Sequence, residues 1–313
     1  MKKLIFLIIP VILLGAGCQS SPTELPSRES KIPVDAVKMT PGLDGLPPIL
    51  HSSEWEDPVP VEGPINTAGG EDSGFYAVDR NEFYVFFTPD VDVPVEEQLL
   101  DEVTGIYVSK NINGEWSEPE RVLLQKPGKL ALDGCEFVQD DTMWICSARE
   151  GYVGLHWFIS EFKNNKWQPP KEAPEEIEKY EVGELHITAD GRTMYFHSAR
   201  AGGQGEYDIW KMDLVDGVWQ EPVNVEIVNS QATEGWPFIS SDGEELWFTR
   251  TYRGSPAIYR SRLANGEWGE PELILSQFAG ESSLDNDGNI YFTHHFYNSD
   301  GMIEADIYMA KKK

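Results

Sequence analysis

A Trp followed three residues later by Pro recurs along this chain, and this repeat constrains the fold more than any other feature. The pairs are Trp55/Pro58, Trp116/Pro119, Trp167/Pro170, Trp219/Pro222 and Trp268/Pro271. Repeats of roughly 50 residues are typical of architectures in which each repeat forms one supersecondary unit that packs against its neighbours. The chain is therefore predicted to contain five copies of one unit from about residue 51 onward.

The stretch from Glu184 to Pro222 shows what the unit contains. Its alternating apolar and polar runs predict four short strands, at 184–188, 193–197, 208–212 and from Trp219 onward. Asp190-Gly191 lies between the first two strands, and Asp-Gly in this position is a strong hairpin signal because both turn residues need positive φ. Five antiparallel four-stranded sheets of this kind predict an all-β, five-bladed β-propeller.

The two ends of the chain are expected to meet in one blade. A Gly opens each predicted first strand, at Gly74, Gly134, Gly183, Gly235 and Gly280, but only three strands follow the last of these. The strand around residues 55–61 precedes the first complete repeat, so it should supply the fourth strand of the last blade. A ring closed in this way leaves no unpaired sheet edge at the seam.

Three segments carry a resemblance to a known family. They read ITADGRTMYFHSARAGGQGEYDIW, EGWPFISSDGEELWFT and WEDPVPVEGPINTAGGED, and they resemble the WD40-like (PD40-type) propeller repeats of TolB and of many bacterial envelope proteins. The resemblance covers about residues 51–313 and implies a propeller of the cell envelope. It says little about function, because such repeats serve scaffolds and enzymes alike.

The N-terminus predicts export. Residues 1–17 have a positive start, an apolar run and small residues before Cys18, as in a lipoprotein signal peptide. Cleavage before Cys18 would leave a lipidated Cys, and several acyl chains give stable anchoring. The alternative is an ordinary signal peptide with an incidental Cys. Lipidation implies the outer membrane and periplasm of a Gram-negative cell, or the cell surface, with residues 18–50 as a flexible Pro- and Ser-rich tether.

The charge of the chain limits its partners. Of 313 residues, 53 are Asp or Glu and 25 are Lys or Arg, which gives a net charge of −28. Such a surface repels nucleic acid and anionic lipid headgroups. We therefore expect a monomer that contacts the membrane only through its lipid and whose partner is an envelope protein or a polysaccharide.

Cys135 and Cys146 are the only cysteines besides Cys18. A two-residue turn at Asp140-Asp141 would place them opposite each other, and an oxidising compartment would favour a disulfide. The pairing would be of the hydrogen-bonded class, whose Cβ atoms are less well placed for a bond. Two alternatives remain open for this pair: a disulfide, or two buried free thiols.

Residues at equal distances from a two-residue turn face each other. Counting outward from Asp190-Gly191 and from Asp287-Gly288 therefore predicts two facing Glu-His pairs near the mouth of the channel, Glu184 with His197 and Glu281 with His294. Their position, where first strands begin and second strands end, makes this mouth the candidate binding site for a polar ligand, a sugar or a metal. The simpler interpretation is that each Glu satisfies its His across the hairpin. The predicted binding residues are Glu184, His197, Arg200, Trp236, Arg250, Glu281 and His294.

No metal site and no cofactor are predicted. Residues 285–289 (DNDGN) resemble the start of a calcium loop, but Gly falls in the wrong place and no Glu closes the pattern. They lie where the repeat needs a turn, and a turn is the prediction. The sequence also lacks a Gly-x-Ser-x-Gly elbow, a His-Glu-x-x-His motif and a phosphate loop.

Two function classes follow. The first is a non-catalytic binding or scaffolding propeller, with binding on the face that carries the 90–104 insertion and the other connections between second and third strands. The second is a carbohydrate-active enzyme, since propeller glycosidases use carboxylates at the channel mouth. Two carboxylates about 5–10 Å apart in an open pocket would favour hydrolysis, whereas a mouth plugged by aromatic side chains would favour scaffolding.

Overall fold

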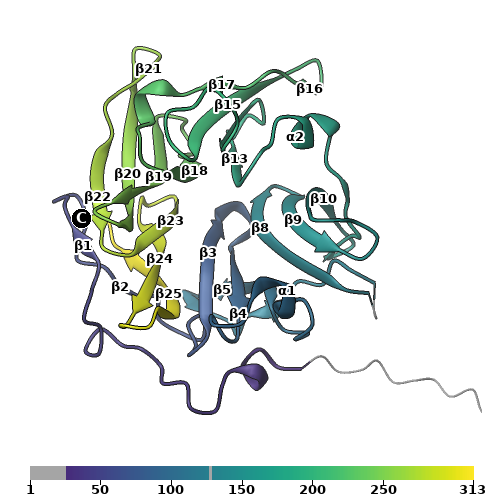
Figure 1. Ribbon diagram of the computed structural model, residues 1–313, viewed down its shortest axis with the longest axis vertical. Helices are drawn as coiled ribbons and strands as arrows, with labels where there is room; N and C mark the ends of the chain where they lie inside the picture. Colours follow the sequence, from purple (N-terminus) through teal and green to yellow (C-terminus); the bar gives the residue numbers. More distant parts are fainter. Residues whose placement is uncertain (1–25, 127–128) are drawn as a thin grey trace, which may run out of the picture.

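The computed structural model describes residues 26–126 and 129–313 and shows an all-β, propeller-like chain (Figure 1). Groups of antiparallel strands surround a common centre, and β3, β8, β13, β18 and β23 are the innermost strands (Figure 1). The predicted signal peptide and Cys18 lie outside the described residues. Within the described part of the chain, no helix has the length and apolarity needed to cross a bilayer.

The first three groups follow one pattern, in which three consecutive antiparallel strands are followed by two short strands that both pair with the third. Their strands are β3 (Gly70–Ala77), β4 (Glu82–Thr88), β5 (Gly105–Ile112), β6 (Glu115–Trp116) and β7 (Glu120–Arg121); β8 (Ala131–Gln139), β9 (Thr142–Arg149), β10 (Leu155–Lys163), β11 (Lys166–Trp167) and β12 (Lys171–Glu172); and β13 (Leu185–Ile187), β14 (Thr193–Ser198), β15 (Asp208–Val215), β16 (Val218–Trp219) and β17 (Val223–Asn224).

The last two groups take strands from the N-terminal segment. The fourth contains β18 (Glu234–Ile239), β19 (Glu245–Tyr252), β20 (Ser255–Ala264), β21 (Glu267–Trp268) and β22 (Glu272–Ser276), and β1 (Ile49–Leu50) adds to β22. The fifth contains β23 (Ala279–Leu284), β24 (Ile290–Tyr297) and β25 (Met302–Ala310), and β2 (Val59–Pro60) pairs with β25. A parallel bridge between Ala305 and Gly70 joins this group to β3.

The Trp and the Pro of each repeat lie at different positions in the strand group. In the first four groups the Trp lies in the first short outer strand, and the Pro falls between the two short strands. Proline has no N–H to donate, so it interrupts an outer strand without breaking a central one. Trp55 instead forms an isolated bridge with Lys312, at the end of the fifth group.

Five apolar clusters form the core: four combine side chains from consecutive groups, and one combines the first group with the fifth. Phe137 and Trp144 of the second group pack with Met194 and Phe196 of the third, for example. Phe83 of the first group shares a cluster with Tyr291 and Ile307 of the fifth. Face-to-face packing between sheets therefore supplies the burial that a single sheet cannot.

Short helices lie in the connections. They are η1 (Arg28–Lys31), η2 (Val78–Arg80), α1 (Val95–Gln98), α2 (Glu175–Lys179) and η3 (Glu226–Val228). The predicted insertion at 90–104 contains α1. Its position between β4 and β5 confirms that the extra residues belong to a connection between a second and a third strand.

Residues 26–50 correct the prediction of a flexible tether. The segment runs along the outside of the strand groups (Figure 1) and is fastened to them by buried polar contacts. The Arg28 side chain is buried, and Nη1 donates to the Ile65 carbonyl at 2.7 Å. Lys38 Nζ lies 2.5 Å from carboxylate oxygens of both Glu304 and Asp306. Proline-rich composition suits an extended segment that packs without strand pairing as well as it suits a free coil.

Candidate functional site

Four of the five innermost strands carry a β-bulge, and the bulges shape the channel. The bulged residues are in the left-handed region, with φ of 51° at Ser73, 54° at Cys135, 50° at Trp236 and 55° at Glu281. A bulge puts two residues opposite one, so that neighbours in sequence can face the same side. Cys135 and Glu136 accordingly both line the channel, as do Glu281 and Ser282.

The bulges also correct the predicted glycine column. Gly134, Gly235 and Gly280 each precede the bulged residue, but in the first group Asp72 holds that position and Gly74 follows the bulge. The prediction was two residues out of register in this group, where Asp72 and Ser73 stand at the positions of Gly134 and Cys135.

A small acidic chamber occupies one end of the channel. It has a volume of about 60 Å³, and its lining includes the carboxylates Glu136, Glu184 and Glu281. No Lys or Arg is among the described residues that line it. Burial raises the pKa of Glu136 and of Glu184 to about 8, and burial together with nearby Asp72 raises the pKa of Glu281 well above its ordinary value. The carboxylates hold protons more tightly here because the chamber offers no compensating positive side chain.

Aromatic rings lie between the acidic chamber and a second cavity and line both of them. The ring of His186 lies 4.6 Å from that of Phe137 and 4.5 Å from that of Phe238, and Phe75 lies 5.6 Å from Phe137. Burial lowers the pKa of His186 to about 3, so the imidazole is neutral at ordinary pH. The four rings come from four different innermost strands and form the narrow part of the channel, which we call the aromatic ring layer.

A larger cavity lies on the other side of this layer, at the end that carries the hairpin turns. Its volume is about 320 Å³, and the aromatic ring layer contributes to its lining. Polar and charged groups from the turns complete it, including Arg80, Asp140, Asp242 and Asp285. The two ends of the channel therefore differ in size, and the predicted binding mouth is the smaller one.

The facing pair Glu184 and His197 is confirmed. The register of β13 and β14 pairs Leu185 with Phe196, and the His197 amide donates to the Glu184 carbonyl at 3.2 Å. The imidazole nevertheless contacts a neighbouring group, since His197 Nδ1 accepts from the Trp236 amide at 3.2 Å. Burial lowers the pKa of His197 to about 4. Glu184, His197 and Trp236 thus meet at the channel.

The facing pair Glu281 and His294 is wrong. The turn at 285–289 is longer than a two-residue turn and the bulge shifts the register again, so His294 pairs with Ala279. His294 is fully buried, with Nε2 3.0 Å from Asp44 Oδ2. Glu281 instead accepts a 2.7 Å hydrogen bond from the Ser73 hydroxyl. The turn prediction itself holds, because the Asp285 carboxylate accepts from the amides of Asp287 and Asn289.

The two predicted arginines are engaged elsewhere. Arg250 Nε donates to Glu234 at 2.7 Å and its Nη2 to the Val228 carbonyl at 2.8 Å. Arg200 lies over the ring of Trp210, at 4.9 Å. The structure therefore gathers Glu184, Trp236 and Glu281 at the channel, with His197 in contact with Trp236. It leaves Arg200, Arg250 and His294 in structural contacts. The sequence analysis missed three polar residues of this region, Asp72, Glu136 and His295.

Cys135 and Cys146 form a disulfide, with Cα atoms 5.3 Å apart. The bulge displaces Cys135 from the regular register, in which Gly134 faces Cys146. Glu136, which follows the bonded Cys135, lines the acidic chamber. The disulfide therefore fixes the backbone that holds one of the chamber carboxylates.

No family model matches the chain, and no curated protein matches it. Solved structures that resemble it include TolB from Acinetobacter baumannii, with 12% identity over 79% of this chain and a TM-score of 0.46. The chain spans 55% of that TolB chain. The endo-arabinase from Bacteroides thetaiotaomicron VPI-5482 shares 16% identity over 80% of this chain and 96% of its own, with a TM-score of 0.48. The catalytic domain of Coprinopsis cinerea GH62 alpha-L-arabinofuranosidase shares 9% identity over 85% and 98%, with a TM-score of 0.47. None of these similarities transfers a function to this chain.

Proposed function

We propose that this chain is an exported, lipid-anchored, five-bladed β-propeller that binds an envelope partner without catalysis. The five strand groups would be the blades, and β2 on β25 would close the ring. The five core clusters support this arrangement, because four join consecutive groups and one joins the first to the last. Closure would also remove the exposed edge of β25.

The observation that carries the proposal is the small volume of the chamber between the carboxylates. Pockets that bind small molecules have volumes of about 300–1,000 Å³, whereas the acidic chamber has about 60 Å³ and ends at the aromatic ring layer. A sugar ring flanked by two carboxylates needs more room than this. The geometry therefore favours binding over glycoside hydrolysis at this end of the channel.

Exposed aromatic side chains support a macromolecular partner on the same face. Tyr152, Tyr207 and Tyr297 are each about two-fifths exposed; the first two belong to connections between second and third strands, and Tyr297 ends the second strand β24. Tyr207 packs edge-on against His197, next to Trp236. Tyr and Trp dominate the energetic centres of protein interfaces, and they also stack on sugars. The partner would be an envelope protein or a polysaccharide.

The test is a pull-down from solubilised membranes with the full-length lipoprotein. Tyr207→Ala should reduce recovery of the partner at least about tenfold, while Asp242→Ala, at the opposite end of the disc, should leave it unchanged. Both variants should melt like the wild type. Loss of binding in Asp242→Ala alone would place the partner at the other end of the channel. If the wild type hydrolyses a polysaccharide and Glu184→Gln does not, the function would be catalysis instead of binding.

The anchor is tested separately at Cys18. The Cys18→Ser variant should appear in the soluble fraction instead of the detergent-requiring fraction, because lipid chains supply the membrane affinity. A variant that stays with the membrane would require another attachment.

The cavity at the hairpin end favours a second candidate function, recognition of a small molecule. Its volume of about 320 Å³ is within the range of ligand pockets, and it combines aromatic and polar lining groups. Ala189→Trp would fill it, whereas Ala201→Trp would alter an exposed loop of the other face. Calorimetry with a panel of mono- and disaccharides should show binding that only Ala189→Trp abolishes. No binding by the wild type would leave the macromolecular partner as the function.

A further inference from the structure

Three side chains from the first and fifth strand groups converge beside the acidic chamber. Asp72 lies on β3, Glu281 on β23 and His295 on β24, and each offers one ligand atom within 4.8 Å of the other two. His295 Nε2 lies 3.9 Å from Asp72 Oδ1, which is too far for a hydrogen bond. The imidazole of His295 therefore faces the Asp72 carboxylate without bonding to it directly.

The distances suit a single cation. Three atoms that lie no more than 4.8 Å apart all lie within about 2.8 Å of one point, and zinc–oxygen and zinc–nitrogen bonds measure about 2.0–2.2 Å. Small side-chain rotations that move each ligand atom by less than about 1 Å would bring all three atoms to bonding distance. Glu281 is also oriented by the Ser73 hydroxyl at 2.7 Å, and support of this kind is typical of metal-binding carboxylates.

An independent observation comes from the unsatisfied groups around the cluster. Glu136 is 6% exposed, lines the same chamber as Glu281, and neither of its carboxylate oxygens has a hydrogen-bond partner among the described residues. His295 Nδ1 is likewise buried without a partner there. Buried polar groups are normally satisfied, and an unsatisfied one indicates strain, a functional role, or a bound water or ion. A positive ion in the chamber would compensate the carboxylates that no Lys or Arg reaches.

We propose that Asp72, Glu281 and His295 bind one divalent transition-metal cation, of the Zn²⁺ or Mn²⁺ type. Imidazole suits Zn²⁺, and carboxylates suit Mn²⁺, so a site with one imidazole and two carboxylates offers ligands to either ion. Three protein ligands leave positions open for water. Water in those positions would lie beside the chamber that the unpartnered Glu136 carboxylate also lines.

The position of the site gives it a structural role. Asp72 belongs to the first repeat and the other two ligands to the last, so the ion links the two ends of the repeat array. Among the residues that the structure describes, the strands of these two groups pair with each other at a single parallel bridge, from Ala305 to Gly70. A ligand that binds the folded state alone stabilises it in proportion to the logarithm of its concentration over Kd.

The experiment uses the full-length chain after treatment with a chelator and exchange into chelator-free buffer. ZnCl₂ and MnCl₂ are titrated separately by calorimetry, and thermal melting is followed in parallel. At least one cation should bind with a stoichiometry of one and raise the melting temperature by several degrees. Glu281→Gln and Asp72→Asn should each weaken binding by at least about tenfold, since each removes a charged ligand.

The matched control is His156→Gln, because His156 Nδ1 lies 3.2 Å from Glu178 in a part-exposed His-carboxylate pair of another blade. This variant should bind the cation like the wild type. The proposal is overturned if a cooperatively melting wild type shows no saturable binding of either cation, if Glu281→Gln binds unchanged, or if His156→Gln loses binding. Glu281→Gln preserves side-chain size and an acceptor for Ser73, and should it fail to fold, Mn²⁺ electron paramagnetic resonance of wild type and His295→Gln gives the same decision.

Discussion

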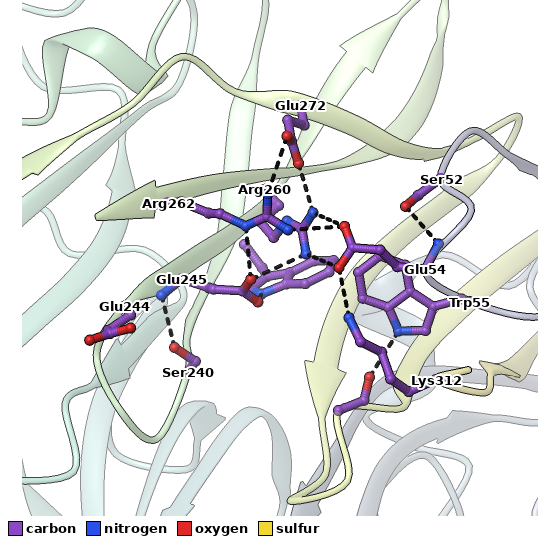
Figure 2. Close-up of polar contacts among 12 residues, drawn as sticks. Ser52, Glu54, Trp55, Ser240, Glu244, Glu245, Arg260, Arg262, Glu272 and Lys312 are labelled. Carbon is purple, nitrogen blue, oxygen red and sulfur yellow. Dashed lines mark hydrogen bonds and ion pairs between the residues drawn. The ribbon is translucent and has the colours of Figure 1, made fainter. Parts of the chain in front are cut away.

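The guanidinium of Arg260 lies 5.1 Å from the ring centre of Trp55, so a side chain of the fourth strand group stacks on one from the N-terminal segment (Figure 2). Glu54 binds Arg260 at 2.6 Å and Lys312 at 2.8 Å, and these bonds hold the pKa of Glu54 well below its usual range. Lys312 Nζ also lies 3.9 Å from the Trp55 ring. Residues 54 and 55 thus fasten the N-terminal segment to the fourth and fifth groups together.

Replacing Trp55 by Ala should destabilise the protein strongly. The Trp55 side chain is 1% exposed and packs edge-on against Trp247, with ring centres 5.6 Å apart. Truncation of a buried Trp typically costs about 3–5 kcal/mol, a large share of a domain's net stability. Denaturant unfolding should show this loss. Trp116→Ala, at a repeat marker that is only partly buried, should cost clearly less, and equal losses would contradict a special role for Trp55.

Lys38→Met should destabilise the protein in a pH-dependent way. Lys38 lies between the buried carboxylates of Glu304 and Asp306, and burial raises the pKa of Asp306 to about 8 despite this lysine. The ion pairs are fully formed only when the carboxylates are charged, so the loss should be larger at pH 9 than at pH 5. We expect about 1–3 kcal/mol at pH 9, since Lys38 is partly exposed.

Lys31→Met is the control for this prediction, because Lys31 is exposed in the same segment. Its unfolding free energy should match that of the wild type at both pH values. If Lys38→Met has the stability of the wild type at pH 9, the ion pairs of Lys38 do not help to hold residues 26–50 against the strand groups.

The repeat structure could be predicted from sequence because it depends on local signals. Trp116 and Pro119 mark an outer strand, and Asp190-Gly191 marks a hairpin, whatever the rest of the chain does. Each unit repeats these signals, so a strand or turn that is poorly marked in one unit can be assigned from the others. These repeated local signals were enough to predict the groups of strands and the register that pairs Glu184 with His197.

The candidate site could not be predicted in the same way because it depends on bulges and distant contacts. Trp236 and Glu281 adopt left-handed backbone conformations that nothing in their residue types requires, and each bulge changes which residues face the channel. His294 was assigned to the mouth by a register that the bulge in β23 breaks. Its true partner, Asp44, comes from a segment 250 residues away.

Removal of the disulfide should lower stability without changing the fold. Cys135 and Cys146 are separated by 11 positions, and closing a loop of this size is worth roughly 2–3 kcal/mol in the chain-entropy model. The double variant Cys135→Ala, Cys146→Ala should melt several degrees below the wild type. Adding a reductant should lower the wild-type midpoint toward that of the variant and leave the variant unchanged. A wild type insensitive to complete reduction would contradict the expected stabilisation.

The last prediction concerns Glu136 and the pH dependence of stability. Burial raises the pKa of Glu136 to about 8 from an ordinary value of 4.5, and neither carboxylate oxygen has a partner among the described residues. The folded state therefore holds this proton more tightly than the unfolded state does. The unfolded state loses it first as pH rises, so this group lowers the stability of the fold progressively between about pH 4.5 and pH 8.

Glu136→Gln removes the ionisation and keeps the size of the side chain. In the presence of a chelator, the variant should unfold with nearly the wild-type free energy at pH 4.5 and be more stable by roughly 2–4 kcal/mol at pH 9. Glu115→Gln, at an exposed position, should follow the wild type at both pH values. A Glu136→Gln variant that is no more stable than the wild type at pH 9 would show that the charged carboxylate is compensated in the folded protein.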